Sequence, residues 1–397
     1  MDFDFTDDQE QLRDAVRRWV AKAYGFERRR AIAAAGGFDR AVLGELAELG
    51  LTALTVPEAQ GGLGQGAVDA MVVMEELGRG LVLAPLAQTL IVAEVLARHA
   101  PEAMQAAWLP RIANGDALVV LAQQERKARY RLDVCDAKAV QTQSGHALTA
   151  HKSIVPAGDS ADAFLVPAQL GDRMALFLVE RHASGVATQG YGTQEGGRAA
   201  ELVLTNAPAT LVTTDGLAAL ELAQDVGIAA TCAYAVGVMD ETLRVTAEYM
   251  NQRKQFGVTI ASFQALRHRM ADMKMQLELA RSMSYYASLK LGASADERRQ
   301  ALSRAKVQLG QSMRFVGQQA VQLHGGIGVT DEYIVSHYFK TLTQLEMSWG
   351  DTLHHLGEVS RRGCLRRLAT VRTRPDLPGC APVTTPAILH PRRDRVG

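Results

Sequence analysis

A turn near residue 255 carries three side-chain types that together suit a nucleotide. The stretch NQRKQFGVTIASFQ contains Arg253, Phe256 and Gln264. A guanidinium can hold phosphate through paired hydrogen bonds, an aromatic ring offers a flat apolar surface, and an amide both donates and accepts. A helical hairpin, with one helix ending at Gly257 and the next capped by Ser262, accounts for the turn but not for this combination. The three residues therefore indicate a nucleotide cofactor.

A second turn, QLHGGIGVTDEY (322 to 333), contains Gly325, Gly326 and Gly328. A dinucleotide-binding loop of the strand-to-helix type needs a strand before it, whereas a helical run ending near Gln322 precedes these glycines. The sequence favours the turn that ends a helix. Because glycine has no Cβ, a phosphate can still approach this backbone closely, so both interpretations can hold together.

The elements that must position these turns follow from the apolar pattern. Helical spacing runs to about residue 112, short apolar runs such as DAFLVPA, MALFLVE and AELVLT follow, and helical spacing then returns. This order predicts an α+β fold and disfavours the alternation of a Rossmann fold. The expected parts are an N-terminal helical domain (1–115), a central β domain (116–213), a C-terminal helical bundle (214–371) and a disordered tail (372–397).

The overall composition excludes several classes of partner. Lys plus Arg and Asp plus Glu each total 43, so no global field attracts nucleic acid or an anionic membrane. The four cysteines have no metal-ligand spacing, and the adjacent His354 and His355 project in different directions on a helix, so we expect no metal site. The acidic start lacks a signal-peptide pattern, and the run 81–97 is short for a membrane span. We expect a cytoplasmic protein.

Five motifs occur in an order that resembles the acyl-CoA dehydrogenase family. They are ELAELGLTALTVPEAQGGLG, MEELGRG, LPRIANGDALVVLAQQE, RKQFG and VQLHGGIGVTDEY, and the resemblance extends from Phe5 to about Leu368. Within the family, RAAELVLT and the segment after Glu332 look most like the small subunit of the pimeloyl-CoA dehydrogenase type. The resemblance implies an N-terminal helical domain, a central β domain, a C-terminal four-helix bundle and noncovalent FAD between the last two.

The resemblance also assigns residues to an FAD site that two subunits share. Arg253 and Phe256 would meet the adenosine diphosphate part of a neighbouring subunit's FAD, with Gln264 nearby. The site would thus require a homotetramer, or a heterotetramer with another acyl-CoA dehydrogenase subunit. The same pocket would be completed by Gln322, Gly325 and Gly326.

On the β side the chain departs from the family pattern. The family's Thr-Glu-Pro stretch becomes QQE, so Gln123 and Gln124, with the backbone of Ala122, would offer hydrogen bonds to the flavin ring. Tyr130 stands where the family has a small hydroxyl residue. Ile154 and Pro156 replace an aromatic and a hydroxyl residue that usually face the flavin.

The family's catalytic base is missing from both of its usual positions. The family reaction removes a proton from the α carbon of an acyl-CoA, and the Glu that accepts it falls on Trp349 or, in some members, on Gly227. An indole accepts no proton. Asp351, Glu346 and Asp225 are the carboxylates close enough in sequence to replace it, although an N-cap role suits Asp351. Glu346 and Asp225 otherwise read as solvated helix residues.

Three functions stay open at this point. The first, which we favour from the sequence, is an FAD-dependent acyl-CoA dehydrogenase that uses Asp351 or Asp225, forms a trans-2-enoyl-CoA and passes electrons to electron-transfer flavoprotein. The second is the base-deficient partner subunit of a heteromeric acyl-CoA dehydrogenase. The third is a flavoprotein oxidase of the same fold.

Overall fold

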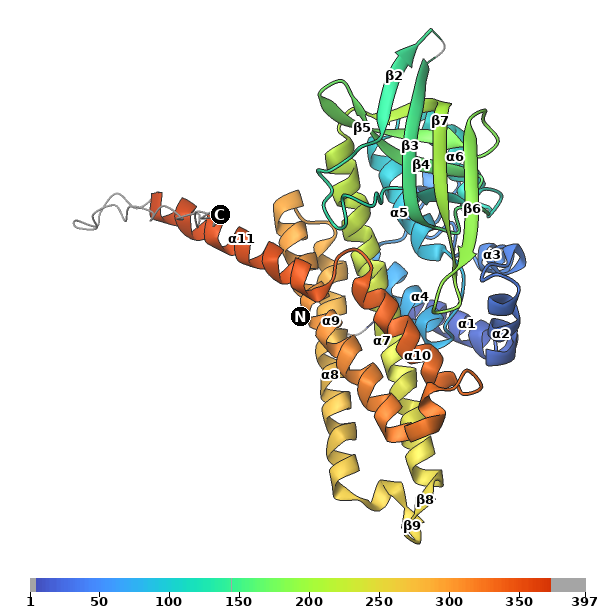
Figure 1. Ribbon diagram of the computed structural model, residues 1–397, viewed down its shortest axis with the longest axis vertical. Helices are drawn as coiled ribbons and strands as arrows, with labels where there is room; N and C mark the ends of the chain where they lie inside the picture. Colours follow the sequence, from blue (N-terminus) through green and yellow to red (C-terminus); the bar gives the residue numbers. More distant parts are fainter. Residues whose placement is uncertain (1–4, 144, 373–397) are drawn as a thin grey trace, which may run out of the picture.

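The computed structural model describes residues 5–143 and 145–372. Figure 1 shows the α+β architecture expected from the sequence, with helices first, a β domain in the middle and long helices last. The predicted tail, 372–397, lies outside the described residues from residue 373 onward. The first helices are α1 (Asp7–Ala23), α2 (Phe26–Ala34), α3 (Arg40–Glu48), α4 (Ala67–Arg79), α5 (Leu86–His99) and α6 (Glu102–Ala113), with the short 3-10 turn η1 (Glu58–Gln60).

The central domain is a closed, mixed sheet with an apolar interior. The pairings β4–β2, β2–β3, β3–β7, β7–β5 and β5–β4 return to their starting strand, β1 adds to β4 in parallel, and β6 pairs with β7. The first six residues of β4 are buried, as its continuous apolar run predicts. The strands are β1 (Val119–Leu121), β2 (Lys138–Thr142), β3 (Gly145–Pro156), β4 (Ala163–Leu170), β5 (Arg173–Glu180), β6 (Val186–Gly192) and β7 (Arg198–Thr213).

The C-terminal helices form a bundle around α7 (Gly216–Gln252). Of the described helices, α7 alone is long and apolar enough to cross a membrane, but 94% of its apolar window is buried inside the protein, so it is the core helix of the bundle. The others are α8 (Gln264–Lys290), α9 (Ala295–His324), α10 (Ile334–Met347) and α11 (Thr352–Arg372).

Two glycines let the N-terminal helices pack tightly on this core. A Cβ on Gly78 of α4 would lie 2.1 Å from the Tyr234 carbonyl oxygen, and one on Gly237 of α7 would lie 1.8 Å from the Glu75 carbonyl oxygen. The backbones of α4 and α7 therefore meet at a distance that only glycine permits. This contact fixes α7 against α4.

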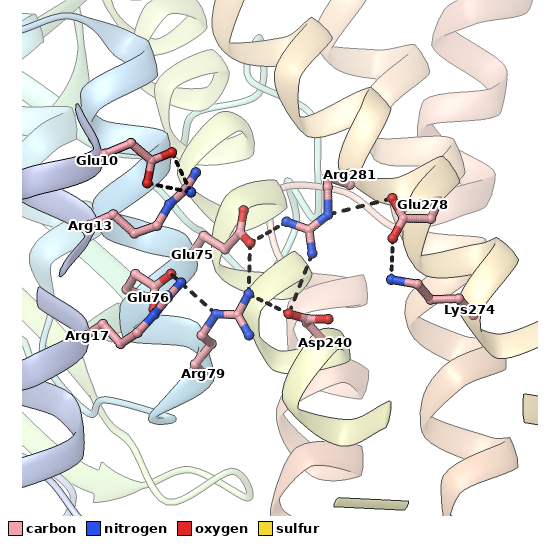
Figure 2. A network of polar contacts seen from close by, with 10 residues as sticks. All are labelled: Glu10, Arg13, Arg17, Glu75, Glu76, Arg79, Asp240, Lys274, Glu278 and Arg281. Atoms are coloured by element: carbon pink, nitrogen blue, oxygen red, sulfur yellow. Dashed lines mark hydrogen bonds and ion pairs between the residues drawn. The ribbon is translucent and has the colours of Figure 1, made fainter. Parts of the chain in front are cut away.

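A network of charged side chains holds the same helices together (Figure 2). Arg79 of α4 bonds Glu75 at 3.3 Å and also pairs with Asp240 of α7, while Arg281 of α8 pairs with both carboxylates. Glu76 is almost fully buried beside Arg79 and bonds Arg17 of α1 at 2.8 Å. Because several partly buried charges share partners, the network orients α1, α4, α7 and α8 more firmly than isolated surface pairs would.

The turn near residue 255 differs from its prediction. Helix α7 ends at Gln252 rather than at Gly257, and a two-stranded hairpin of β8 (Lys254–Gln255) and β9 (Val258–Thr259) follows. Ser262 is not the N-cap of α8; it ends the 3-10 turn η2 (Ile260–Ser262), and its hydroxyl donates to the Thr259 carbonyl. Local sequence favoured helix ends, but a tight hairpin with Phe256 and Gly257 at positive φ connects the two helices.

The glycine turn matches its prediction. Helix α9 ends at His324, Gly325 has φ 63°, and the 3-10 turn η3 (Gly325–Val329) follows. No strand precedes it, so the turn ends a helix and does not start one.

Candidate functional site

A cavity of about 320 Å³ lies between the β domain and the helices α5, α7 and α10. Its β side is formed by the residues after β1 and the end of β3, and its helical side by one face of α7 and the C-terminal half of α10. The lining is mostly apolar with a few polar groups, as in small-molecule sites generally. It includes Gln123, Gln124, Tyr130, Ile154, Pro156, Gln224, Gln344 and Trp349.

The sheet uses part of the backbone on the β side of the cavity. The Ala122 N–H already donates to the Leu165 carbonyl at 2.9 Å, and the Gln124 carbonyl accepts from the Ser153 N–H at 2.9 Å. The sheet therefore uses these two atoms, and hydrogen bonds to a flavin from the other backbone and amide groups of Ala122, Gln123 and Gln124 stay a prediction. The Gln123 Oε1 is buried without a partner among the described residues, and such an acceptor is costly unless a ligand donor satisfies it.

Two bulky side chains at this cavity lie on unusual backbone. Ile154 has φ 54° and Trp349 has φ 61°. A β-branched residue at positive φ is a genuine outlier that costs on the order of 1–3 kcal/mol. The surrounding packing holds both walls of the cavity in this conformation.

Trp349 packs on Gly227, so the two positions to which the resemblance assigns the base are in contact. A Cβ built on Gly227 would lie 2.6 Å from Trp349 Cε2. The Trp349 carbonyl accepts hydrogen bonds from Gln224 Nε2 at 2.9 Å and from His355 Nε2 at 3.0 Å. Burial lowers the pKa of His355 to about 3, so this imidazole is neutral and its Nε2 carries the proton that it donates. The indole occupies the space that a side chain on residue 227 would need.

Lys306 fixes the turn that carries Trp349. This residue of α9 is fully buried, and its Nζ donates to the carbonyls of Glu346 at 2.7 Å and Gly350 at 2.9 Å. Burial lowers the pKa of Lys306 to about 8. A buried ammonium with two backbone acceptors thus closes both ends of the turn.

The two candidate bases do not line the cavity. Asp351 is the N-cap of α11, as predicted, since its Oδ1 accepts from the His354 N–H at 2.8 Å, and its Oδ2 bonds Arg129 at 3.1 Å. Asp225 was expected to be a solvated residue if not a base, and that is wrong: it is 1% exposed and pairs with Arg298 at 2.8 Å and Arg299 at 3.2 Å. Its burial raises the pKa of Asp225 despite both guanidinium groups.

Glu346 was also expected to be solvated, and this too is wrong. Glu346 is 7% exposed, its Oε1 accepts from the Thr352 N–H at 3.1 Å, and it pairs with Arg314 at 3.2 Å. It caps the start of α11 together with Asp351 and does not line the cavity.

Glu195 is the one carboxylate of the described chain that does line the cavity, and the sequence analysis missed it. It lies between β6 and β7, where its Oε1 accepts from the Thr193 hydroxyl at 2.6 Å and its carbonyl accepts from Arg29. Arg29 also reaches His337 near the start of α10, whereas Trp349 follows the end of that helix. Glu195 therefore belongs to the opposite end of the cavity, and no motif around it could have indicated this.

The residues predicted for the shared nucleotide site lie elsewhere. None of them lines the cavity; the hairpin is at the tip of the bundle far from the β domain (Figure 1). Stacking of Tyr249 on His324, with ring centroids 4.4 Å apart, brings the glycine turn beside the end of α7 from which the hairpin leaves. All of them are exposed, Phe256 at 92%. They are Arg253, Phe256, Gln264, Gln322, Gly325 and Gly326.

No group of three metal-ligating side chains occurs among the residues that the structure describes. The adjacent His354 and His355 differ in environment: His354 lies beside Tyr130, with ring centroids 5.3 Å apart, and His355 is buried. Both histidines belong to the first turn of α11, and His354 contacts Tyr130, which lines the cavity.

Two family models match the chain, the acyl-CoA dehydrogenase N-terminal domain over residues 6–116 and the acyl-CoA dehydrogenase C-terminal domain over residues 214–363. The acyl-CoA dehydrogenase IpdE2 of Mycobacterium tuberculosis is 30% identical over 84% of this chain and 90% of its own length. This chain belongs to the acyl-CoA dehydrogenase family.

Two similar solved structures carry the names of two proteins each. A variant of the Tcur3481-Tcur3483 steroid ACAD is 28% identical with a TM-score of 0.85, covering 91% of this chain and 99% of that one. The ChsE4-ChsE5 complex from Mycobacterium tuberculosis is 27% identical with a TM-score of 0.82, covering 92% and 99%.

FAD is the cofactor of the acyl-CoA dehydrogenase family, and the cavity fits a flavin ring. A glutaryl-CoA dehydrogenase from Mycobacterium smegmatis, 20% identical with a TM-score of 0.82, was solved in complex with FADH2 and shares this fold over 90% of this chain and 94% of its own. Apolar walls suit the ring, and the unpartnered Gln123 Oε1 suits a ring N–H. When bound, FAD supplies the acceptor for the hydride that leaves an acyl-CoA.

Proposed function

We propose that this chain is the base-deficient partner subunit of a heteromeric acyl-CoA dehydrogenase. A second family member supplies the carboxylate that accepts the α proton, and this chain lends its hairpin and glycine turn to the FAD bound there. The assembled enzyme oxidises an acyl-CoA to a trans-2-enoyl-CoA in the cytoplasm and passes electrons to electron-transfer flavoprotein.

The contact between Trp349 and Gly227 carries this proposal. Both family positions for the base are filled by one indole lying on one glycine, at 2.6 Å from the place of a Cβ. General-base catalysis is typically worth about 10²- to 10⁴-fold, so a chain without it turns over slowly by itself. Asp351 and Asp225 support the first hypothesis poorly, because each has two oxygens engaged by a cap or by guanidinium groups.

The exposed hairpin supports the donor role. The Arg253 side chain makes no hydrogen bond or ion pair with another described residue, and Phe256 is 92% exposed. An unpaired guanidinium beside an exposed aromatic ring is a surface that suits a nucleotide held by a neighbouring subunit. The similarity to complexes named for two proteins each agrees with a heteromer. No comparable observation favours the oxidase.

The test is purification of the tagged chain from its own host, followed by native mass spectrometry and a count of FAD per polypeptide. We expect a heteromer with a second acyl-CoA dehydrogenase-family chain, whose FAD is bleached by acyl-CoA. A homo-oligomer of this chain alone, with one FAD per polypeptide that acyl-CoA bleaches, overturns the proposal.

Variants of the hairpin separate FAD binding from assembly. Arg253→Gln and Phe256→Ala should lower the FAD content of the heteromer while its native mass stays unchanged. Lys254→Gln, which removes a neighbouring exposed charge, is the matched control and should retain FAD. Equal FAD content in all three variants contradicts the donor role.

A further inference from the structure

A second cavity, of about 240 Å³, lies on another face of α7. Its walls come from the start of α4, the middle of α5, one stripe of α7 and the end of α8. An apolar cavity of about 150 Å³ already binds benzene, so this one has room for a larger ring system. It is distinct from the first cavity, since the two share no lining residue.

The floor of this cavity is apolar and built from small side chains. Val226, Ala229 and Ala230 form its α7 wall, opposite Met71 of α4 and Leu90 of α5. The alanines leave the space that larger residues at those positions would fill. Apolar surface of this kind gains free energy when an apolar ligand covers it, at roughly 25 cal/mol per Å².

Ser288 is the buried polar residue of this lining, Thr55 and Gln65 are more exposed, and a charged pair lies at the edge. Ser288 of α8 is only 3% exposed, it lines the cavity, and its hydroxyl bonds no other described residue. This hydroxyl is available to a ligand donor or acceptor in the cavity. Glu94 and Arg98 of α5 pair with each other at the rim and are partly exposed, which marks the open side.

We propose that this second cavity binds a mostly apolar one- or two-ring molecule that carries a single hydroxyl or carbonyl group. The rings lie against Ala229, Ala230 and Leu90, and the polar group bonds the Ser288 hydroxyl. Because Glu94 and Arg98 pair with each other, the rim has no net charge that would attract a charged ligand. The ligand is therefore uncharged.

The second cavity also lies close to Trp349, which lines the first cavity. Val226 and Ala230 lie on α7 near Gly227, on which Trp349 packs. Val226 and Ala230 belong to one apolar cluster, and Trp349 packs against it. A ligand here changes the surroundings of Trp349 without touching FAD. Tryptophan fluorescence can therefore report binding in the chain alone, whatever its partner is.

The experiment titrates the purified chain with 1-naphthol by isothermal calorimetry, with tryptophan fluorescence as a second readout. We expect one saturable site. Ala229→Leu fills the cavity and should weaken binding by at least about tenfold, since an added side chain and the ligand compete for the same volume. Circular dichroism checks that this variant is folded.

Ser288→Ala tests the polar contact separately. Loss of one neutral hydrogen bond should weaken 1-naphthol about three- to tenfold and leave naphthalene unaffected. Ser282→Ala is the matched control on the same helix, because the Ser282 hydroxyl is exposed and donates to the Glu278 carbonyl. Absence of saturable binding, or binding that neither Ala229→Leu nor Ser288→Ala weakens, overturns the proposal.

Discussion

The indole of Trp349 lies directly on Gly227: a Cβ at residue 227 would be 2.6 Å from Cε2 and 2.8 Å from Cζ2 of the ring. Gly227→Ala should therefore destabilise the protein by about 1–3 kcal/mol through overpacking. In a Trp349→Ala background the clash is gone, and the same change should be neutral or stabilising by up to about 1 kcal/mol, because alanine favours helix. Urea denaturation of the four proteins measures this coupling. Additive effects contradict the contact.

Asp351 should behave as a helix cap. Asp351→Ala should cost about 1 kcal/mol, because the His354 N–H loses its acceptor. Asp351→Asn keeps an oxygen acceptor and should stay within about 0.5 kcal/mol of the parent, as Asn caps nearly as well. In the assembled heteromer it should also leave bleaching by acyl-CoA unchanged. If Asp351→Asn abolishes bleaching in a folded complex, Asp351 is the base after all.

Asp225 should be structural and strongly coupled to its arginines. Asp225→Ala leaves the largely buried guanidinium groups of Arg298 and Arg299 without a carboxylate, which should cost about 3–5 kcal/mol in unfolding free energy. Glu221→Gln is the control on the same helix: Glu221 is more exposed and lies 3.9 Å from Arg299, so its loss should cost less than about 1 kcal/mol. Similar costs for the two changes would count against this role.

Lys306 predicts a pH dependence of stability. Its pKa is lowered to about 8 in the folded protein, below the unfolded value near 10.4, so the unfolded state binds more protons between these pH values. Stability from this group is present above the unfolded pKa and is lost as the pH falls through about 8. The unfolding free energy of the parent relative to Lys306→Met should rise by roughly 2–3 kcal/mol from pH 8 to pH 10.5. A flat difference across this range contradicts the burial of a titrating ammonium.

The sequence predicted the order of elements because apolar periodicity is a local property. The runs DAFLVPA and MALFLVE became β4 and β5, and the glycine turn after His324 ended a helix as expected. The cap at Asp351 was also predictable, since a capping side chain and its acceptor helix are adjacent in sequence.

The environments of the candidate site residues depend on partners that are distant in sequence, so they could not be predicted. Asp225 is buried because Arg298 and Arg299 reach it from α9, and nothing near residue 225 indicates those arginines. The same holds for Trp349 on Gly227: each position was singled out by the family pattern, but their contact depends on how α7 and the end of α10 pack. The residues of the shared FAD site stay predictions, because they complete a site only with a neighbouring subunit.

This chain has no proton acceptor at residues 227 and 349, and Glu195, the one carboxylate of the described residues that lines the cavity, lies at its opposite end. The direct measurement is exchange of the α hydrogens of acyl-CoA thioesters with D2O, followed by mass spectrometry, with the purified chain alone. We expect no exchange above buffer for short, long or cyclic acyl groups, and exchange to appear in a Gly227→Glu, Trp349→Ala double variant. Exchange catalysed by the parent chain at a rate typical of general-base catalysis would contradict the account.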